Sequence, residues 1–210
     1  MSAPESWLAL CRRLGARRGA QEVHAALAAR YAEPPRAYHN LDHVAFCLDE
    51  FEPLRREAES AGGVELALWF HDAACDPRRD DNEVRSAELA VAAVARLGLG
   101  ARLGGLVYEL VLDTRHSAEP ETPDGRIVAD VDLAVLGRPP AAFDAYERAV
   151  REEYGWVPEA EFRRARARVL GGFLARPAVY RTPLMAAKYE AAARANLARS
   201  LGQLESGGGA

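Results

Sequence analysis

The segment VELALWFHD, residues 64–72, constrains the fold more than any other part of the chain. It is apolar nearly all round a helix, and Glu65 is the main exception before His71. A helix without a polar face is usually buried in the middle of its domain. This one nevertheless ends in two adjacent polar side chains, His71 and Asp72, and a buried carboxylate needs a strong partner. A bound cation would supply that partner, so the segment predicts a buried helix that ends at a metal site.

Helical spacing dominates the rest of the chain. From residue 103 onward, apolar residues recur at i, i+3, i+4, i+7 and i+8, as on one face of a helix; they are Leu103, Leu106, Val107, Leu110 and Val111. Similar patterns predict helices over 5–14, 19–32, 82–97 and 184–201, and one with Pro158 in its first turn that carries Phe162, Val169, Leu170 and Phe173. The helix over 82–97 is expected to begin at Asp81 or Asn82 as N-cap and to end at Gly98. Alternation with a period of two is scarce. The chain is therefore predicted to be all-α, with about eight to ten helices.

The domain organisation is predicted to be simple. We expect a single helical domain over 1–205, followed by a frayed tail over 206–210 with the sequence SGGGA. Neither an internal repeat nor an interdomain linker is evident. The longest irregular stretch runs over 114–125, and a loop of that length inside a compact domain is often a lid or a binding loop.

The composition of the chain argues against some classes of binding partner and favours one kind of cellular compartment. The formal net charge of −4 argues against broad binding to nucleic acid or to an anionic membrane, since both need a basic face. The three cysteines, Cys11, Cys47 and Cys75, are widely spaced and form no CxxC pair, so neither a disulfide framework nor a thiolate zinc site is expected. No apolar run has the length of a signal peptide or of a membrane span. These features favour a reducing, cytoplasmic setting.

Four clusters contain most of the side chains that could bind a metal. They are YHNLDH over 38–43, the pair His71–Asp72, His116 in the long loop, and the segment with Asp130 and Asp132. The two aspartates lie two residues apart on one short predicted helix, so they point to different sides.

The helix around His43 has two different sides. Its apolar face is predicted to contain Leu41, Val44, Ala45 and Leu48. His43, Cys47 and Glu50 lie roughly opposite that face. Spacing alone therefore leaves His43 as a solvent-facing histidine, and its role rests on the order of the motifs.

That order resembles a known family. YHNLDHV, then ALWFHDAACD, DNEVRSAELA and DVDLAVLG, is similar to a bacterial branch of predicted HD-superfamily metal-dependent phosphohydrolases, over roughly residues 25–200. In that superfamily two imidazoles and two carboxylates from separate helices bind one metal in the core of a helical bundle. The resemblance implies that His43, His71, Asp72 and Asp132 are the ligands here, with Asp130 as the alternative to Asp132.

The implied chemistry is hydrolysis of a phosphate ester. Mixed nitrogen and oxygen ligands suit one divalent ion, Mn²⁺, Fe²⁺, Co²⁺, Mg²⁺ or Zn²⁺, and the sequence does not choose among them. Such an ion lowers the pKa of a bound water and polarises a phosphoryl oxygen. The resemblance implies that Asp72 is the catalytic residue, because it can bind the ion and also orient or deprotonate that water. The expected substrate is a nucleotide or another small phosphorylated metabolite.

Two further histidines are candidates for contacts with substrate or with the ligands. His39 lies four residues before His43 and would share its face on a continuous helix; alternatively, it precedes a helix capped by Asn40. His116 is expected to contact the substrate phosphate, and an exposed loop histidine is the competing interpretation.

Arg115 and Glu83 complete the predicted site. Arg115 adjoins His116 and would bind phosphate through its bidentate guanidinium; Arg36, Arg181 and Lys188 are weaker candidates for that role. The resemblance places Glu83 near the pocket, although complementing a helix dipole is an adequate structural explanation for it.

Two other functions remain open at this level. One is a non-catalytic HD module that holds a metal structurally or binds a nucleotide. The other is a di-iron oxygenase, which needs additional histidine ligands, and His39 and His116 are the only spares. The Ala-rich face of 184–201 could pack internally or across the two-fold axis of a homodimer.

Overall fold

The computed structural model describes residues 3–206, and within them the chain forms helices and turns with no strand. The prediction of an all-α chain with about eight to ten helices is confirmed. Ser206 is the last residue of the last helix, whereas 207–210, the rest of the predicted tail, lie outside the described residues. The elements are α1 Ala3–Leu14, α2 Ala20–Tyr31, α3 Leu41–Phe51, η1 Glu52–Leu54, α4 Ala61–Phe70, α5 Asn82–Arg96, α6 Ala101–Leu112, η2 Asp113–Arg115, α7 Pro123–Asp132, η3 Leu133–Gly137, α8 Pro140–Glu153, α9 Glu159–Leu174 and α10 Pro183–Ser206.

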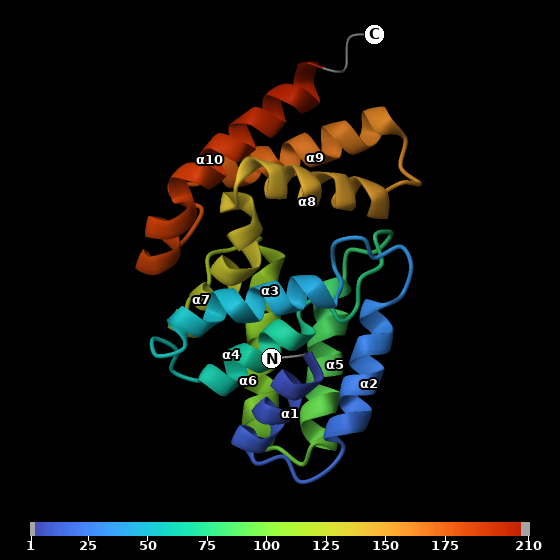
Figure 1. Ribbon diagram of the computed structural model, residues 1–210, viewed down its shortest axis with the longest axis vertical. Helices are drawn as coiled ribbons and strands as arrows, with labels where there is room; N and C mark the ends of the chain where they lie inside the picture. Colours follow the sequence, from blue (N-terminus) through green and yellow to red (C-terminus); the bar gives the residue numbers. More distant parts are fainter. Residues whose placement is uncertain (1–2, 207–210) are drawn as a thin grey trace. The chain divides into compact units, whose positions relative to one another are not determined.

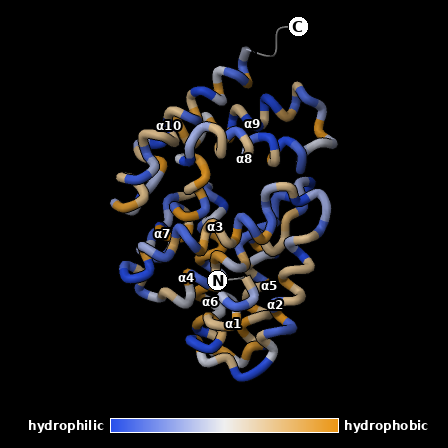
Figure 2. The backbone as a smooth tube through the Cα atoms, in the orientation of Figure 1, coloured by the Kyte–Doolittle hydropathy of each residue, from blue (hydrophilic) through white to orange (hydrophobic). Residues whose placement is uncertain are grey.

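The chain divides into two compact units (Figure 1). The N-terminal unit contains α1 to α7 and ends at Asp132, and the C-terminal unit contains η3 and α8 to α10. The prediction of a single helical domain over 1–205 stays a prediction, because two compact units can belong to one domain. In Figure 2, hydrophobic and hydrophilic residues alternate along most helices, as expected where one side of each helix faces a core. None of the described helices has the length and apolar character needed to cross a membrane.

Helix α4 is the centre of the N-terminal unit. Every residue from Gly63 to Phe70 is buried, as the apolar sequence predicts. The helix packs against α1, α3, α5, α6 and α7. Trp69 meets Trp7 of α1 edge to face, with ring centroids 5.4 Å apart. Because α4 has neighbours on all sides, its C-terminal end lies in the interior of the unit.

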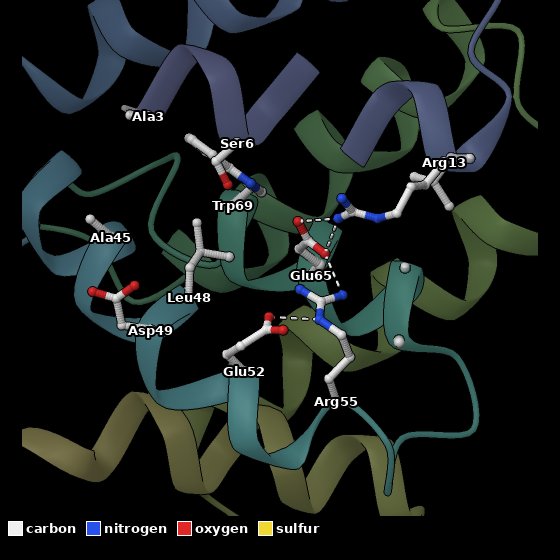
Figure 3. A pocket seen from close by; sticks show the side chains of 13 residues that line it. Ala3, Ser6, Arg13, Ala45, Leu48, Asp49, Glu52, Arg55, Glu65 and Trp69 are labelled. Atoms are coloured by element: carbon white, nitrogen blue, oxygen red, sulfur yellow. Dashed lines mark hydrogen bonds and ion pairs between the residues drawn. The ribbon is translucent and has the colours of Figure 1, made fainter. Parts of the chain in front are cut away.

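Glu65, the charged residue of α4, is paired with arginines inside the unit. Glu65 is only 2% exposed, and its two carboxylate oxygens accept hydrogen bonds from Arg13 Nη2 at 2.7 and 2.6 Å. Arg55 Nη1 lies 2.8 Å from the same carboxylate. Figure 3 shows the two guanidinium groups meeting Glu65 at the wall of a cavity of about 820 Å³. Two cations from other segments thus allow a carboxylate to lie on an otherwise apolar helix.

Other sequence predictions are met with small changes. Helix α5 begins after Asp81 and is followed by Gly98 at a φ of 73°, as the predicted glycine stop requires. Of the apolar residues that α9 carries, Phe162 and Leu170 are buried, whereas Val169 is 48% exposed. Consecutive helical residues are turned about 100° apart, so Val169 points away when Leu170 enters the core.

The C-terminal unit is tied together through α10. Asn196 donates hydrogen bonds to the carbonyls of Leu136 and Arg138 at 2.9 and 2.8 Å, which holds the end of η3 against that helix. Gly137 lies so close to α10 that a Cβ atom there would be 2.5 Å from Tyr189 Cβ. Only a residue without a side chain fits this contact.

The Glu65 arrangement gives a first prediction. Changing Arg13 and Arg55 together to Met would leave a buried carboxylate unpaired, and we expect a loss of about 3 kcal/mol in the free energy of unfolding. Urea titration measures it. The matched control changes the exposed neighbours Arg12 and Arg56 to Met and should cost little. Adding Glu65→Gln to the first variant should recover most of the loss, and an unchanged urea midpoint would contradict the pairing.

Gly137 gives a second prediction. Gly137→Ala should lower the free energy of unfolding by about 1–3 kcal/mol, because the added methyl overlaps Tyr189, which cannot move without repacking α10. Gly172→Ala is the matched control, since nothing lies within 4 Å of a Cβ atom there. That control should stabilise α9 by up to about 1 kcal/mol through helix propensity. Equal effects of the two changes in thermal unfolding would refute the close contact.

Candidate metal centre

His71 directly follows α4 and is held by its last turn. Its backbone N–H donates to Ala67 O at 2.8 Å, and its side chain is 1% exposed. The ring atom Nδ1 lies 2.9 Å from Leu68 O. A carbonyl only accepts hydrogen bonds, so Nδ1 carries a proton, and in the neutral ring Nε2 presents a lone pair to the interior. The end of α4 therefore orients an imidazole as a metal ligand requires.

His43 lies on the buried side of α3, which corrects the predicted orientation. The buried residues of this helix are His43, Val44, Cys47 and Phe51, whereas Ala45, placed on the predicted apolar face, is exposed. Leu41 and Leu48 of that predicted face are only half-buried. The polar side of α3 faces α4 and α7 because His43 finds partners there, which hydrophobic spacing alone does not reveal.

Asp132, the last residue of α7, supplies the carboxylate that the sequence left open. Its Oδ1 lies 3.2 Å from His43 Nε2 and 3.5 Å from His71 Nε2. Asp130 is also buried, but it precedes Asp132 by two residues and so points about 200° away around the helix. The structure thus brings Asp132 to the two histidines.

Asp72 completes what we call the central cluster, His43, His71, Asp72 and Asp132. Its Oδ2 lies 3.0 Å from His71 Nε2 and 3.5 Å from His43 Nε2, and the two Nε2 atoms are 3.0 Å apart. Ligand atoms about 2.0–2.2 Å from one ion are separated by about 3.0–3.5 Å in octahedral or tetrahedral arrangements. The distances from each carboxylate to the two histidine nitrogens therefore fit a single divalent ion.

A buried oxygen also fits a cation. Asp72 Oδ2 is shielded from solvent and faces the Nε2 atoms of His71 and His43 at 3.0 and 3.5 Å. Unless one of these nitrogens carries a proton, the buried oxygen has no donor, and a positive ion at the centre of the cluster would remove the cost of burying it.

The pKa values in the cluster depend on burial and on the opposite charges of its histidines and aspartates. Burial lowers the pKa of His43. Burial would do the same to His71, but the charges of Asp72 and Asp132 outweigh it and hold the pKa of His71 well above its usual value. Burial would raise the pKa of both aspartates, and the surrounding histidines keep each below its ordinary value. A proton on His71 thus balances the carboxylates, and a bound cation would replace that proton.

The accessible side of the cluster is the carboxylate side. The histidine side chains are 1% exposed, whereas those of Asp72 and Asp132 are 22% and 18% exposed. A small ligand would therefore approach the centre past the two aspartates.

His116 contacts the centre through Asp132. Its Nε2 lies 2.8 Å from Asp132 Oδ2, so the two oxygens of that carboxylate face different imidazoles. His116 has a φ of 54° and is the only non-glycine among the described residues in this left-handed region. Such backbone is uncommon and often marks a functional site. The sequence predicted His116 beside substrate; the structure places it on a candidate ligand, in an orienting position.

His39 does not continue the helix of His43. Asn40 is the N-cap of α3, and its side chain accepts hydrogen bonds from the backbone N–H groups of Asp42 and His43 at 2.9 and 3.3 Å. His39 therefore precedes the helix, as the alternative interpretation had it. Its ring still lies near the centre, with its centroid 6.1 Å from that of His43.

Two other predicted site residues face each other. Arg115 Nε lies 3.9 Å from Glu83 Oε2, and both side chains are about one-third exposed, at 37% and 32%. A pair this open is available to reorganise around an anion.

The importance of two residues was underestimated from the sequence. Arg36 was a weak candidate for phosphate, but it donates to the carbonyls of His39, Asp72 and Ala73 at 3.0, 2.6 and 3.1 Å. It thereby holds the segment before α3 against the end of α4. The sequence placed Cys47 only on the same side of the helix as His43. In the structure its Sγ lies 3.7 Å from both ring nitrogens of His43. Its i+4 spacing from His43 was the available signal.

Comparison of the chain with protein-family models, with curated proteins and with solved structures gives no significant match. What the centre can bind therefore follows from its own residues and from the motifs that they form.

Proposed function

We propose that the protein hydrolyses a phosphate ester of a nucleotide or another small metabolite, with one divalent ion held by the central cluster. The observation that carries the proposal is the convergence of two imidazole nitrogens, 3.0 Å apart, with two carboxylate oxygens that each lie 3.0–3.5 Å from both nitrogens. The four side chains come from α3, from the end of α4 and from α7. The order of the motifs, which resembles that of HD-superfamily phosphohydrolases, supports the reaction class. When bound, the ion would lower the pKa of a water and polarise a phosphoryl oxygen.

The residues of the centre divide the remaining work. The buried histidines fix the position of the ion, and the partly exposed Asp72 reaches the accessible side, where it can orient a water and accept its proton. His116 holds the carboxylate of Asp132 by its second oxygen. Arg115 is proposed to leave Glu83 and bind the anionic part of the substrate.

The first test measures metal content and turnover together. Protein freed of metal by chelation and reloaded with Mn²⁺ or Co²⁺ should bind one ion per chain, and His71→Ala should abolish that binding. Loaded wild type should hydrolyse p-nitrophenyl phosphate or a member of a nucleotide panel. Asp72→Asn should lower kcat by about 10²–10⁴-fold without unfolding the chain, because the amide cannot accept a proton. Asp80→Asn, at an exposed position, is the control.

The outcomes separate two functions. Wild type that binds the ion but turns over no phosphate ester would contradict catalysis and indicate a non-catalytic metal-binding module. Wild type that binds no ion, or a fully active Asp72→Asn variant, would overturn the assignment of the centre.

His116 gives a separate prediction. His116→Ala should weaken Mn²⁺ binding by about 10–100-fold, because Asp132 loses the partner that orients it. His116→Gln retains an N–H donor and should recover part of the affinity. Direct titration of metal into the two variants measures the difference, and unchanged affinity in His116→Ala would show that Asp132 is positioned without it.

A further inference from the structure

Arg36 joins the two segments that carry the histidines of the central cluster. Its Nη1 donates hydrogen bonds to the carbonyls of Asp72 and His39 at 2.6 and 3.0 Å, and its Nη2 donates to the carbonyl of Ala73 at 3.1 Å. His39 directly precedes the residue that caps α3, and the other two residues lie just beyond the end of α4. One guanidinium group thus holds both segments through their backbone.

The end of α4 depends on donors from outside the helix. The last carbonyl groups of a helix have no partner within it, and a cation near them also complements the helix dipole. Here Trp69 O accepts a hydrogen bond from the hydroxyl of Tyr31 at 3.1 Å, and Tyr31 belongs to α2 and is 2% exposed. The carbonyls of Asp72 and Ala73 accept from Arg36. The turn that carries Asp72 is therefore held by side chains that precede α3.

Tyr31 also fixes the guanidinium group. Cζ of Arg36 lies 5.1 Å from the centroid of the Tyr31 ring, and Nε of Arg36 is shielded from solvent. A planar fork that stacks on an aromatic ring and reaches neighbouring carbonyls is a property of arginine and not of lysine. The group cannot reach a substrate anion without losing these contacts, which argues against the phosphate-binding role for which the sequence made Arg36 a weak candidate.

Asp72 is held on both sides as a result. His71, before it, is fixed to the last turn of α4 by its backbone N–H and by its ring. Ala73, after it, donates its N–H to Phe70 O at 2.9 Å, and its carbonyl accepts from Arg36. With its backbone fixed, the carboxylate of Asp72 moves only about its own side-chain bonds, which keeps it beside the cluster.

We propose that Arg36 is a positioning residue of the metal centre. By holding the carbonyl of Asp72, it keeps that carboxylate at the distances from His43 and His71 that a single ion requires. Residues that orient metal ligands from outside the ligand set contribute about 10–100-fold to metal affinity. This inference rests on the proposed metal site, and it assigns Arg36 to the backbone of the protein and not to the substrate.

Chemical rescue tests the role without any activity measurement. Arg36→Ala should weaken Mn²⁺ binding by about 10–100-fold, measured by titration of metal-free, folded protein. Guanidinium chloride at about 20 mM, far below the molar concentrations that unfold proteins, should restore at least about tenfold in affinity by occupying the space between the carbonyls and Tyr31. Sodium chloride at the same concentration should not. Arg36→Lys keeps the charge but loses the fork, so it should also bind Mn²⁺ at least about fivefold more weakly than wild type.

Arg166→Ala is the matched control. Arg166 is also largely buried, with 11% of its side chain exposed, but it lies in the C-terminal unit and pairs with Glu147. The control should lower the urea midpoint and leave the Mn²⁺ affinity of the folded protein unchanged. It thereby separates a loss of positioning from a general loss of stability.

The result that overturns the inference differs from the one that overturns the proposed function. Wild-type Mn²⁺ affinity in Arg36→Ala, with a raised KM for the phosphate ester, would return Arg36 to substrate binding and leave the central cluster intact. No Mn²⁺ binding by the wild type would remove both. If Arg36→Ala fails to fold, Arg36→Lys decides the question, because a weakened Mn²⁺ affinity supports the inference and an unchanged one overturns it.

Discussion

The N-terminal unit depends on one electrostatic requirement, which is that the polar end of a buried helix must be neutralised. Helix α4 is buried along its length, and it ends at His71 and Asp72. Buried charges persist only where opposite charges or donors surround them. Here the partners come from α3 and α7, so these helices must pack against α4 before the cluster is complete.

The same helix shows two solutions to the problem of a buried carboxylate. Glu65, near its start, is paired with two arginines and needs nothing further. Asp72, after its end, is surrounded by histidines whose charge depends on protonation, and its buried Oδ2 has a donor only when a proton lies on the Nε2 atom of a neighbouring histidine. The first arrangement is structural and complete. The second is complete only with a proton or a metal ion, which makes it the place where the protein can respond to a ligand.

Sequence analysis predicted those features that depend on local pattern. The burial of α4, the all-α class and the stop at Gly98 follow from apolar spacing and from the conformational freedom of glycine. The buried side of α3 was predicted wrongly. Apolar spacing places Ala45 in the core, and it does not account for a histidine that is buried because polar partners surround it. The contacts of Arg13 with Glu65 and of His116 with Asp132 join residues 52 and 16 positions apart in the chain, and no local pattern contains them.

The central claim is that one divalent ion lies between His43, His71 and the two carboxylates. The most direct measurement is an anomalous difference map from crystals of the protein soaked in Mn²⁺. We expect one strong peak within about 2.3 Å of His43 Nε2, His71 Nε2 and an oxygen of Asp132. A map with no peak at that point, in protein whose four side chains are ordered, would contradict the claim.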